Sequence, residues 1–275
     1  MAPTYLESTE LSRIAPTWDR LKQQQRKALI PYIVAGDPEA SVTVDLMHAL
    51  VGAGADMIEL GVPFSDPMAE GPVIQKGHER ALAQKVSLRA CLSMVSAFRE
   101  TDQSTPVILM GYANPIEHMG HSAFASAASD AGIDGVITVD LPPEEVGAMN
   151  SELKRVGIDN IFLIAPTTPD ERVPIITDQA SGFIYYVSLK GVTGAGHLDF
   201  TEVAEKVNFV KGHTDLPVAV GFGIKDAESA NRIGANADGV VVGSALVDLL
   251  GNSDWSISER QARAIALVAD IRAGI

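Results

Sequence analysis

The segment GAGADMIEL at residues 52–60 connects the end of a helical stretch to a short apolar strand. Similar segments recur as DAGIDGVIT at 130–138, RVGIDNIFL at 155–163 and GANADGVVV at 234–242. In each one a glycine is placed to end a helix in the left-handed conformation, and an aspartate then leads into the next strand. A junction that recurs in this way indicates a chain built from repeated βα units.

Short apolar runs rich in Val, Ile and Tyr follow these junctions and recur elsewhere, and each predicts a buried strand. Most of their starts lie 22 to 34 residues apart, with Ala-rich stretches of helical period such as 41–54 and 122–132 between them. The predicted strands are 29–34, 56–61, 106–112, 135–141, 160–166, 182–189, 216–223 and 238–245.

Eight such units predict an α/β fold, a (β/α)8 TIM barrel, with residues 5–27 as an extra N-terminal helix. A doubly wound sheet is the competing architecture, but no GxGxxG segment follows the first strand. The sequence has no linker or low-complexity tract, so we expect one domain over residues 1–275.

The composition excludes several classes of protein. The chain of 275 residues carries 21 Lys+Arg and 35 Asp+Glu, a formal net charge of −14, which argues against nucleic-acid binding and against a polybasic membrane-surface protein. The single cysteine, Cys91, fits a reducing compartment. With no secretory signal at the N-terminus and no apolar run long enough to span a membrane, we expect a cytoplasmic protein.

The longest interval between strands, after the second one, holds the segment GVPFSDPMAEGPVIQKG at 61–77. Barrel active sites lie on the loops that follow the strands, so chemistry is expected here first. Glu59 ends the second strand inside an apolar run and should point into the barrel, where burial raises a carboxyl pKa and suits it to proton transfer. Glu70 adds a second carboxylate on the loop. The other interpretation of Glu59 is a structural acid bonded to backbone amides.

Glycine-rich loops follow the sixth, seventh and eighth strands, at 191–196, 221–223 and 243–245. In barrels such loops often hold a phosphate through backbone N–H groups and a short helix N-terminus, and Ser244 would add a hydroxyl. We therefore predict a phosphate site, with ordinary turn chemistry as the alternative. No metal site is expected, because His118 and His121 lack carboxylates at ligand spacing.

Several segments together resemble the α subunit family of tryptophan synthase. The most diagnostic is ELGVPFSDPMAEGPVIQ at 59–75, and the others, in family order, are PYIVAGDP at 31–38, MGYANPI at 110–116, DLPPEE at 140–145, VSLKGVTGA at 187–195 and VGFGIK at 220–225. The resemblance implies a retro-aldol cleavage of indole-3-glycerol phosphate to indole and glyceraldehyde 3-phosphate, with no cofactor in this chain. It also implies an α2β2 tetramer, in which a β subunit holds pyridoxal phosphate and consumes the indole.

The resemblance also assigns roles to individual residues. Glu59 matches the catalytic glutamate, whereas Glu70 stands where the best-known members carry aspartate, one methylene shorter. Leu189 stands where some members carry arginine, so an arginine-dependent closure of that loop is not assumed. The residues implied to bind substrate are Tyr32, Met110, Tyr112, Tyr185, Thr193, Gly194, Phe222, Gly223, Gly243 and Ser244. Those implied to contact the β subunit are Asp66, Pro67, Asn114 and Pro142.

Two other functions stay open at this point. One is a different phosphate-binding barrel enzyme, such as a sugar-phosphate isomerase, although those use Asp or Cys at strand ends and here the second strand offers Glu59. The other is a barrel that only activates a partner, which would have no need of Glu59, Glu70 and the glycine loops. Lys190 suggests a Schiff-base aldolase only weakly, because it lies in a glycine-rich loop and not in a strand.

Overall fold

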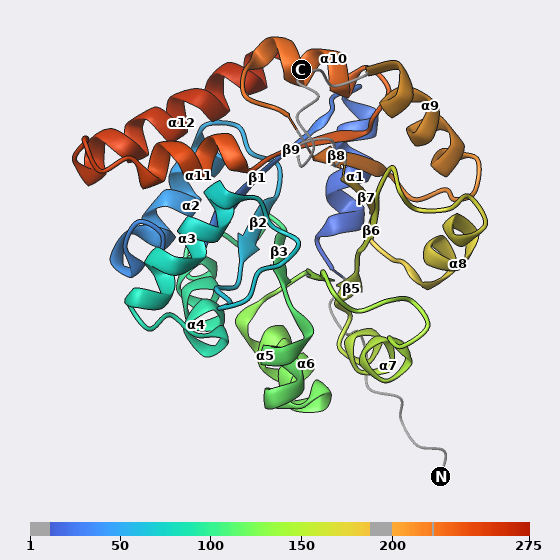
Figure 1. Ribbon diagram of the computed structural model, residues 1–275, viewed down its shortest axis with the longest axis horizontal. Helices are drawn as coiled ribbons and strands as arrows, with labels where there is room; N and C mark the ends of the chain where they lie inside the picture. Colours follow the sequence, from blue (N-terminus) through green and yellow to red (C-terminus); the bar gives the residue numbers. More distant parts are fainter. Residues whose placement is uncertain (1–11, 188–199, 222) are drawn as a thin grey trace.

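The computed structural model describes residues 12–187, 200–221 and 223–275. A parallel sheet runs through this part of the chain in the order β5-β4-β3-β2-β1-β9-β8-β7-β6, and helices surround it (Figure 1). The strands are β1 (Ala28–Val34), β2 (Ile58–Gly61), β3 (Val107–Gly111), β4 (Gly135–Thr138), β5 (Asp159–Asn160), β6 (Phe162–Ile164), β7 (Ile184–Val187), β8 (Val218–Gly221) and β9 (Gly239–Val242). The helices are α1 (Ile14–Gln23), the 3-10 helix η1 (Ala40–Val42), α2 (Thr43–Gly52), α3 (Pro72–Ala83), α4 (Leu88–Arg99), α5 (Ala113–Met119), α6 (His121–Ala131), α7 (Gly147–Arg155), α8 (Arg172–Gln179), α9 (Phe200–Lys211), α10 (Ala227–Gly234), α11 (Ser244–Gly251) and α12 (Ile257–Gly274).

The barrel is closed by the fifth predicted strand, which the structure divides into β5 and β6. β5 pairs with β4 and β6 pairs with β7, so the two ends of the sheet are adjacent parts of one run. Only Ile161 separates them, and its N–H donates to the carbonyl of Val136 at 2.9 Å. The predicted TIM barrel of eight strands is therefore confirmed, with the fifth strand divided into two short ones. The predicted runs extend beyond the strands, mostly into the loops at their carboxyl ends.

The extra N-terminal helix is also confirmed, as α1, and it covers the N-terminal end of the barrel. Ile14, Trp18 and Leu21 form its buried face. Ile14 and Trp18 lie against Gly135 and Gly239, the first residues of β4 and β9. Figure 1 shows α1 inside the ring of the other helices. The helix is shorter than predicted, and residues 5–11 of the prediction lie outside the described residues.

The repeated junction aspartates bind the strands together at this same end. In three of the four junctions the aspartate carboxylate accepts the backbone N–H near the start of the neighbouring strand. The pairs are Asp56 with Leu29 at 3.0 Å, Asp134 with Val107 at 2.8 Å and Asp238 with Val218 at 2.8 Å. Each hydrogen bond joins the start of one strand to the start of its neighbour. The repeated sequence segment therefore corresponds to a repeated hydrogen bond that fixes strand register.

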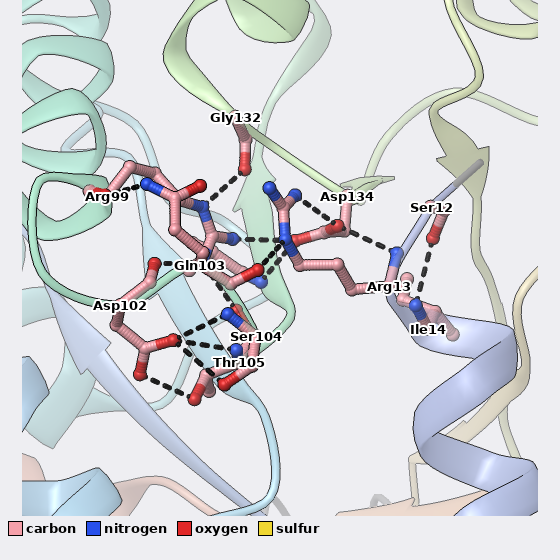
Figure 2. Close-up of polar contacts among 11 residues, drawn as sticks. Ser12, Arg13, Ile14, Arg99, Asp102, Gln103, Ser104, Thr105, Gly132 and Asp134 are labelled. Carbon is pink, nitrogen blue, oxygen red and sulfur yellow. Dashed lines mark hydrogen bonds and ion pairs between the residues drawn. The ribbon is translucent and has the colours of Figure 1, made fainter. Parts of the chain in front are cut away.

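Asp134 has the most extensive set of partners, shown in Figure 2. The Arg99 guanidinium donates to one of its oxygens at 2.7 Å and the Arg13 guanidinium to the other at 3.0 Å. Arg99 also donates to the carbonyls of Gly132 and Thr105. Arg99 and Asp134 are both buried, and their charges offset each other at the junction of α4, β3 and β4.

The long interval after β2 contains less loop than the sequence indicated. Residues 62–71 form the loop, and α3 begins at Pro72, a residue suited to the first turn of a helix because its missing N–H is not needed there. α4 then fills the rest of the interval. Glu70 therefore lies two residues before a helix, at the carboxyl end of β2. Across residues 12–187, 200–221 and 223–275, no helix has the length and apolar character needed to cross a membrane.

Candidate active site

The carboxyl ends of β1, β2 and β7 bring three of the predicted residues together inside the barrel. Tyr32 of β1 and Glu59 of β2 are register partners, so their side chains leave the sheet on the same face. Both are almost completely buried, with 3% and 1% of their surfaces exposed. Tyr185 of β7 is also buried, and its pKa is raised by burial and then by the charge of Glu59. The structure thus places Glu59 beside Tyr32 in the sheet and near enough to Tyr185 for its charge to act on that phenol.

Two glycines make room for those phenols. A Cβ atom at Gly61, the last residue of β2, would collide with the hydroxyl of Tyr32. A Cβ atom at Gly221, the last residue of β8, would collide with the hydroxyl of Tyr185 in the same way. Close approach therefore requires glycine at both strand ends. The consequence is that both hydroxyls lie at the carboxyl end of the barrel, where barrel enzymes bind their ligands.

The two carboxyl groups differ strongly from ordinary surface acids. Burial, and after it the charge of Glu70, raises the pKa of Glu59 well above its usual value. Its Oε1 atom has no hydrogen-bond partner among the described residues. Burial raises the pKa of Glu70 to about 7. The site thus combines a buried acid whose pKa is strongly raised with one whose pKa is about 7, an arrangement suited to general acid–base chemistry.

The loop that carries Glu70 is held at three backbone points. The N–H of Phe64 donates to His78 Nδ1 at 3.0 Å, and the N–H of Ala69 donates to the Tyr112 hydroxyl at 3.2 Å. The Glu70 carbonyl accepts a hydrogen bond from the Gln75 side chain at 2.8 Å. The Phe64 ring also stacks on Tyr112, with 4.9 Å between ring centroids. Glu70 is therefore presented by a loop with a fixed backbone, and Tyr112 is one of the residues that fix it.

The predicted phosphate site is described only in part. Gly243 precedes α11, which begins at Ser244, and the position of a Cβ on Gly243 is 3.5 Å from Tyr32 Cβ. The first N–H groups of a helix have no intrahelical acceptor and carry partial positive charge, so this end of α11 offers an anion site next to β1. Gly223 has a φ of +67°, a left-handed conformation that favours glycine. Thr193, Gly194 and Phe222, together with Leu189 and Lys190, lie outside the described residues.

The residues predicted to contact a partner lie at the same end of the barrel. Asp66, Asn114 and Pro142 are exposed and follow β2, β3 and β4, while Pro67 is half-buried. Met68 in the same loop exposes 78% of its surface. Met110, predicted to bind substrate, is half-buried at the end of β3.

The family model for the tryptophan synthase alpha chain matches residues 18–274. The alpha chain of Thiobacillus denitrificans is 57% identical over 265 residues, 96% of this chain and 96% of that protein. The alpha chain of Thioalkalivibrio sulfidiphilus is 56% identical over 262 residues, 95% of this chain and 98% of its own length. The crystal structure of tryptophan synthase subunit alpha from Legionella pneumophila gives a TM-score of 0.90 at 45% identity and covers 97% of this chain and 99% of that chain. The chain belongs to the tryptophan synthase alpha chain family.

Membership of this family makes the chain a subunit of an enzyme, and the resemblance seen in the sequence is confirmed. One residue of the site was missed by sequence reasoning. His78, on α3, is 2% exposed and contacts both the loop backbone and Tyr32. A histidine inside an amphipathic helix gives no sequence signal of such contacts. Its partners, 14 and 46 residues away along the chain, are brought to it only by the fold.

Proposed function

We propose that this family member cleaves indole-3-glycerol phosphate to indole and glyceraldehyde 3-phosphate. The observation that carries the proposal is the pair of carboxyl groups at the carboxyl end of the barrel. Glu59 is buried without a partner for Oε1 among the described residues, and Glu70 has a pKa of about 7. Proton transfers are the only chemistry that this cleavage needs, and these two groups can supply them.

In the proposed reaction the bond between indole C3 and the adjacent glycerol carbon breaks. Glu59 in its acid form gives a proton to C3, which leaves the ring positively charged. The electrons of the breaking bond then return to the ring, while the hydroxyl on the glycerol carbon becomes the aldehyde carbonyl and gives its proton back to the Glu59 carboxylate. The net change is the transfer of one hydrogen from oxygen to carbon, so the ring itself is the electron acceptor.

Glu70 would act on the other side of the indole. Its carboxylate accepts the indole N–H, which stabilises the positive charge of the C3-protonated ring, and it returns any proton that it takes. A phosphate bound at Gly223, Gly243 and the α11 N-terminus would hold the far end of the substrate. Binding energy gained there is then available to position the reacting bond between the two acids.

We further propose that the exposed loops after β2, β3 and β4 contact a tryptophan synthase β subunit in an α2β2 assembly. Asp66, Pro67, Asn114 and Pro142 lie on them, and Met68 offers an apolar contact beside them. In this arrangement pyridoxal phosphate belongs to the β subunit and this chain holds no cofactor. The chain would act as one domain in the cytoplasm.

Turnover of indole-3-glycerol phosphate by the isolated chain is the direct test. Indole release should be measurable without a partner, should be abolished by Glu59→Gln, and should persist in Glu100→Gln, which changes an exposed glutamate at the end of α4. A folded chain that releases no indole alone or with a β subunit would contradict the proposal. Isomerisation of a sugar phosphate in its place would identify the other kind of barrel enzyme.

The phosphate end of the substrate can be tested by charge. Gly223→Asp would place a carboxylate beside the expected dianion, whereas Gly223→Asn has nearly the same shape without the charge. Calorimetric titration with glycerol phosphate should show much weaker binding to the Asp variant than to the Asn variant, because like charges in contact repel by several kcal/mol at low effective dielectric. Equal affinities would mean that the phosphate binds elsewhere.

A further inference from the structure

His78 occupies a position between the Glu70 loop and the barrel interior. Its Nδ1 accepts the Phe64 N–H at 3.0 Å, and its Nε2 lies 3.3 Å from the Tyr32 hydroxyl. A backbone N–H can only donate, so Nδ1 must be unprotonated. Burial lowers the pKa of His78 to about 4, and the ring is therefore neutral near pH 7. A neutral ring with an unprotonated Nδ1 carries its hydrogen on Nε2.

This tautomer determines what the Tyr32 hydroxyl can do. Since Nε2–H donates to it, the hydroxyl oxygen is the acceptor in this contact, and its own hydrogen must point away from His78. Tyr32 is the register partner of Glu59, and the charges of both Glu70 and Glu59 act on it. Among the described residues the Tyr32 hydroxyl makes no other hydrogen bond. Its hydrogen is therefore available to the two carboxyl groups or to a ligand held between them.

We propose that His78 is a positioning residue of this site, which orients the Tyr32 hydroxyl as a donor toward the carboxyl pair and the bound substrate. Through Phe64, the same ring fixes the loop that carries Glu70 relative to β1. His78 does not touch the reacting atoms in this proposal, and it acts through Tyr32 and the loop. The inference rests on the proposed indole-3-glycerol phosphate cleavage and adds to it a residue outside the pair of acids.

Three substitutions separate the two contacts. In His78→Asn the amide oxygen can replace Nδ1 as acceptor for Phe64, but the side chain is too short to reach Tyr32. In His78→Gln the amide nitrogen can reach the Nε2 position and donate to Tyr32. Tyr32→Phe removes the hydroxyl and keeps the ring. Glu79→Gln, an exposed neighbour of His78 on α3, is the matched control and should leave kcat and KM unchanged.

We expect His78→Asn and Tyr32→Phe each to lower kcat about tenfold, the scale of a small loss of orientation, with KM within about twofold of wild type. His78→Gln should recover the part of the loss in kcat that comes from the Tyr32 contact, although it lacks the acceptor for the Phe64 N–H. The double variant Tyr32→Phe with His78→Asn should be no slower than either single variant, because both remove the same contact. The melting temperature of each variant shows whether it is folded.

Other outcomes would overturn the inference. Additive losses in the double variant would show that His78 does not act through Tyr32. A kcat for Tyr32→Phe equal to that of wild type would also show that His78 does not act through Tyr32. This result is decisive even if His78→Asn does not fold. If wild type cleaves the substrate and these variants behave like it, the proposed function stands and the role of His78 is wrong. If wild type does not cleave the substrate at all, both fail.

Discussion

Carboxylates at the two ends of the barrel are in opposite situations. At the N-terminal end Asp56, Asp134 and Asp238 each accept a backbone N–H and form an ion pair with arginine or lysine. At the carboxyl end Glu59 and Glu70 form no ion pair among the described residues, and burial, followed by the charge of Glu70, raises the pKa of Glu59. Within the described part of the chain, the same functional group thus has an ion-pair partner at one end and none at the other.

This difference indicates how the molecule divides stability and activity. An acid that is paired and hydrogen-bonded fixes the backbone around it, which is what the strand starts require. An acid that is buried without an ion-pair partner has a raised pKa, which costs stability but allows proton transfer. Substitutions at the two ends should therefore affect different measurements.

Glu59→Gln should have the largest effect, a fall in kcat of about 10⁴-fold, the upper range for loss of a general acid–base group. It should not lower the free energy of unfolding. The folded-state pKa of Glu59 is raised, so the stability linked to its proton is present at low pH and is lost as pH rises. Glutamine cannot ionise, and the variant should therefore become more stable than wild type with increasing pH. Urea unfolding at pH 6 and pH 9 measures this, and a variant less stable at both values would contradict the comparison.

Asp134→Asn should show the opposite behaviour. It leaves the buried Arg99 without its counter-charge, and breaking a buried ion pair costs about 3–5 kcal/mol of unfolding free energy. The kcat of the fraction that remains folded should stay close to that of wild type, because Asp134 lies at the far end of the barrel. Denaturant unfolding and active-site-normalised kinetics give the two values. A large fall in kcat with an unchanged free energy of unfolding would contradict the inference that the N-terminal end supports stability and the carboxyl end supports activity.

The pKa of about 7 for Glu70 predicts the pH dependence of turnover. If its ionised form accepts the indole N–H, kcat/KM should fall about tenfold per pH unit below pH 7, to roughly 100-fold at pH 5. At pH 8 and above this limb should be flat. Glu70→Gln should lack the limb and be slow throughout. A wild-type kcat/KM that does not change between pH 5 and 7 would show that the ionised form of Glu70 is not required for turnover.

Glu70→Asp tests how far the loop can adapt. Since the loop backbone is held at Phe64, Ala69 and Glu70 itself, it should not move to compensate for a carboxylate shortened by one methylene. We expect kcat to fall about 10- to 100-fold, equivalent to roughly 1.4–2.8 kcal/mol, and Glu70→Ala to be far slower. An Asp variant as fast as wild type would show that the loop adjusts freely in solution.

Asp238→Asn should have the smallest effect on the free energy of unfolding. It compares an exposed junction aspartate with the buried Asp134 at the same end of the barrel. Its ion pair with Lys211 is partly exposed, at 37% and 31% of the two side chains, whereas Asp134 is 1% exposed. Exposed pairs contribute little, so the loss of stability should be about 1 kcal/mol, mainly from the weakened bond to the Val218 N–H. A cost as large as that of Asp134→Asn would mean that exposure does not decide the strength of these junctions.

The sequence by itself determined the repeat and the chemistry of the strand ends. Helix-ending glycines, junction aspartates and apolar runs are local features, and from them follow the eight βα units, the inward direction of Glu59 and the position of Glu70 on the loop after β2. The family could also be identified from the segment at 59–75, because its residues are adjacent in the chain.

Only the tertiary structure decided which groups meet. The barrel closes at Ile161 through strands that are distant in the sequence. Asp134 pairs with Arg13, 121 positions away, and His78 contacts Tyr32, 46 positions away. No local pattern encodes such contacts, since each depends on how helices pack against strands once the barrel has closed. The pKa values follow from the same cause. Burial dominates the shifts of Glu59, Glu70 and His78, and burial is a property of the folded chain as a whole.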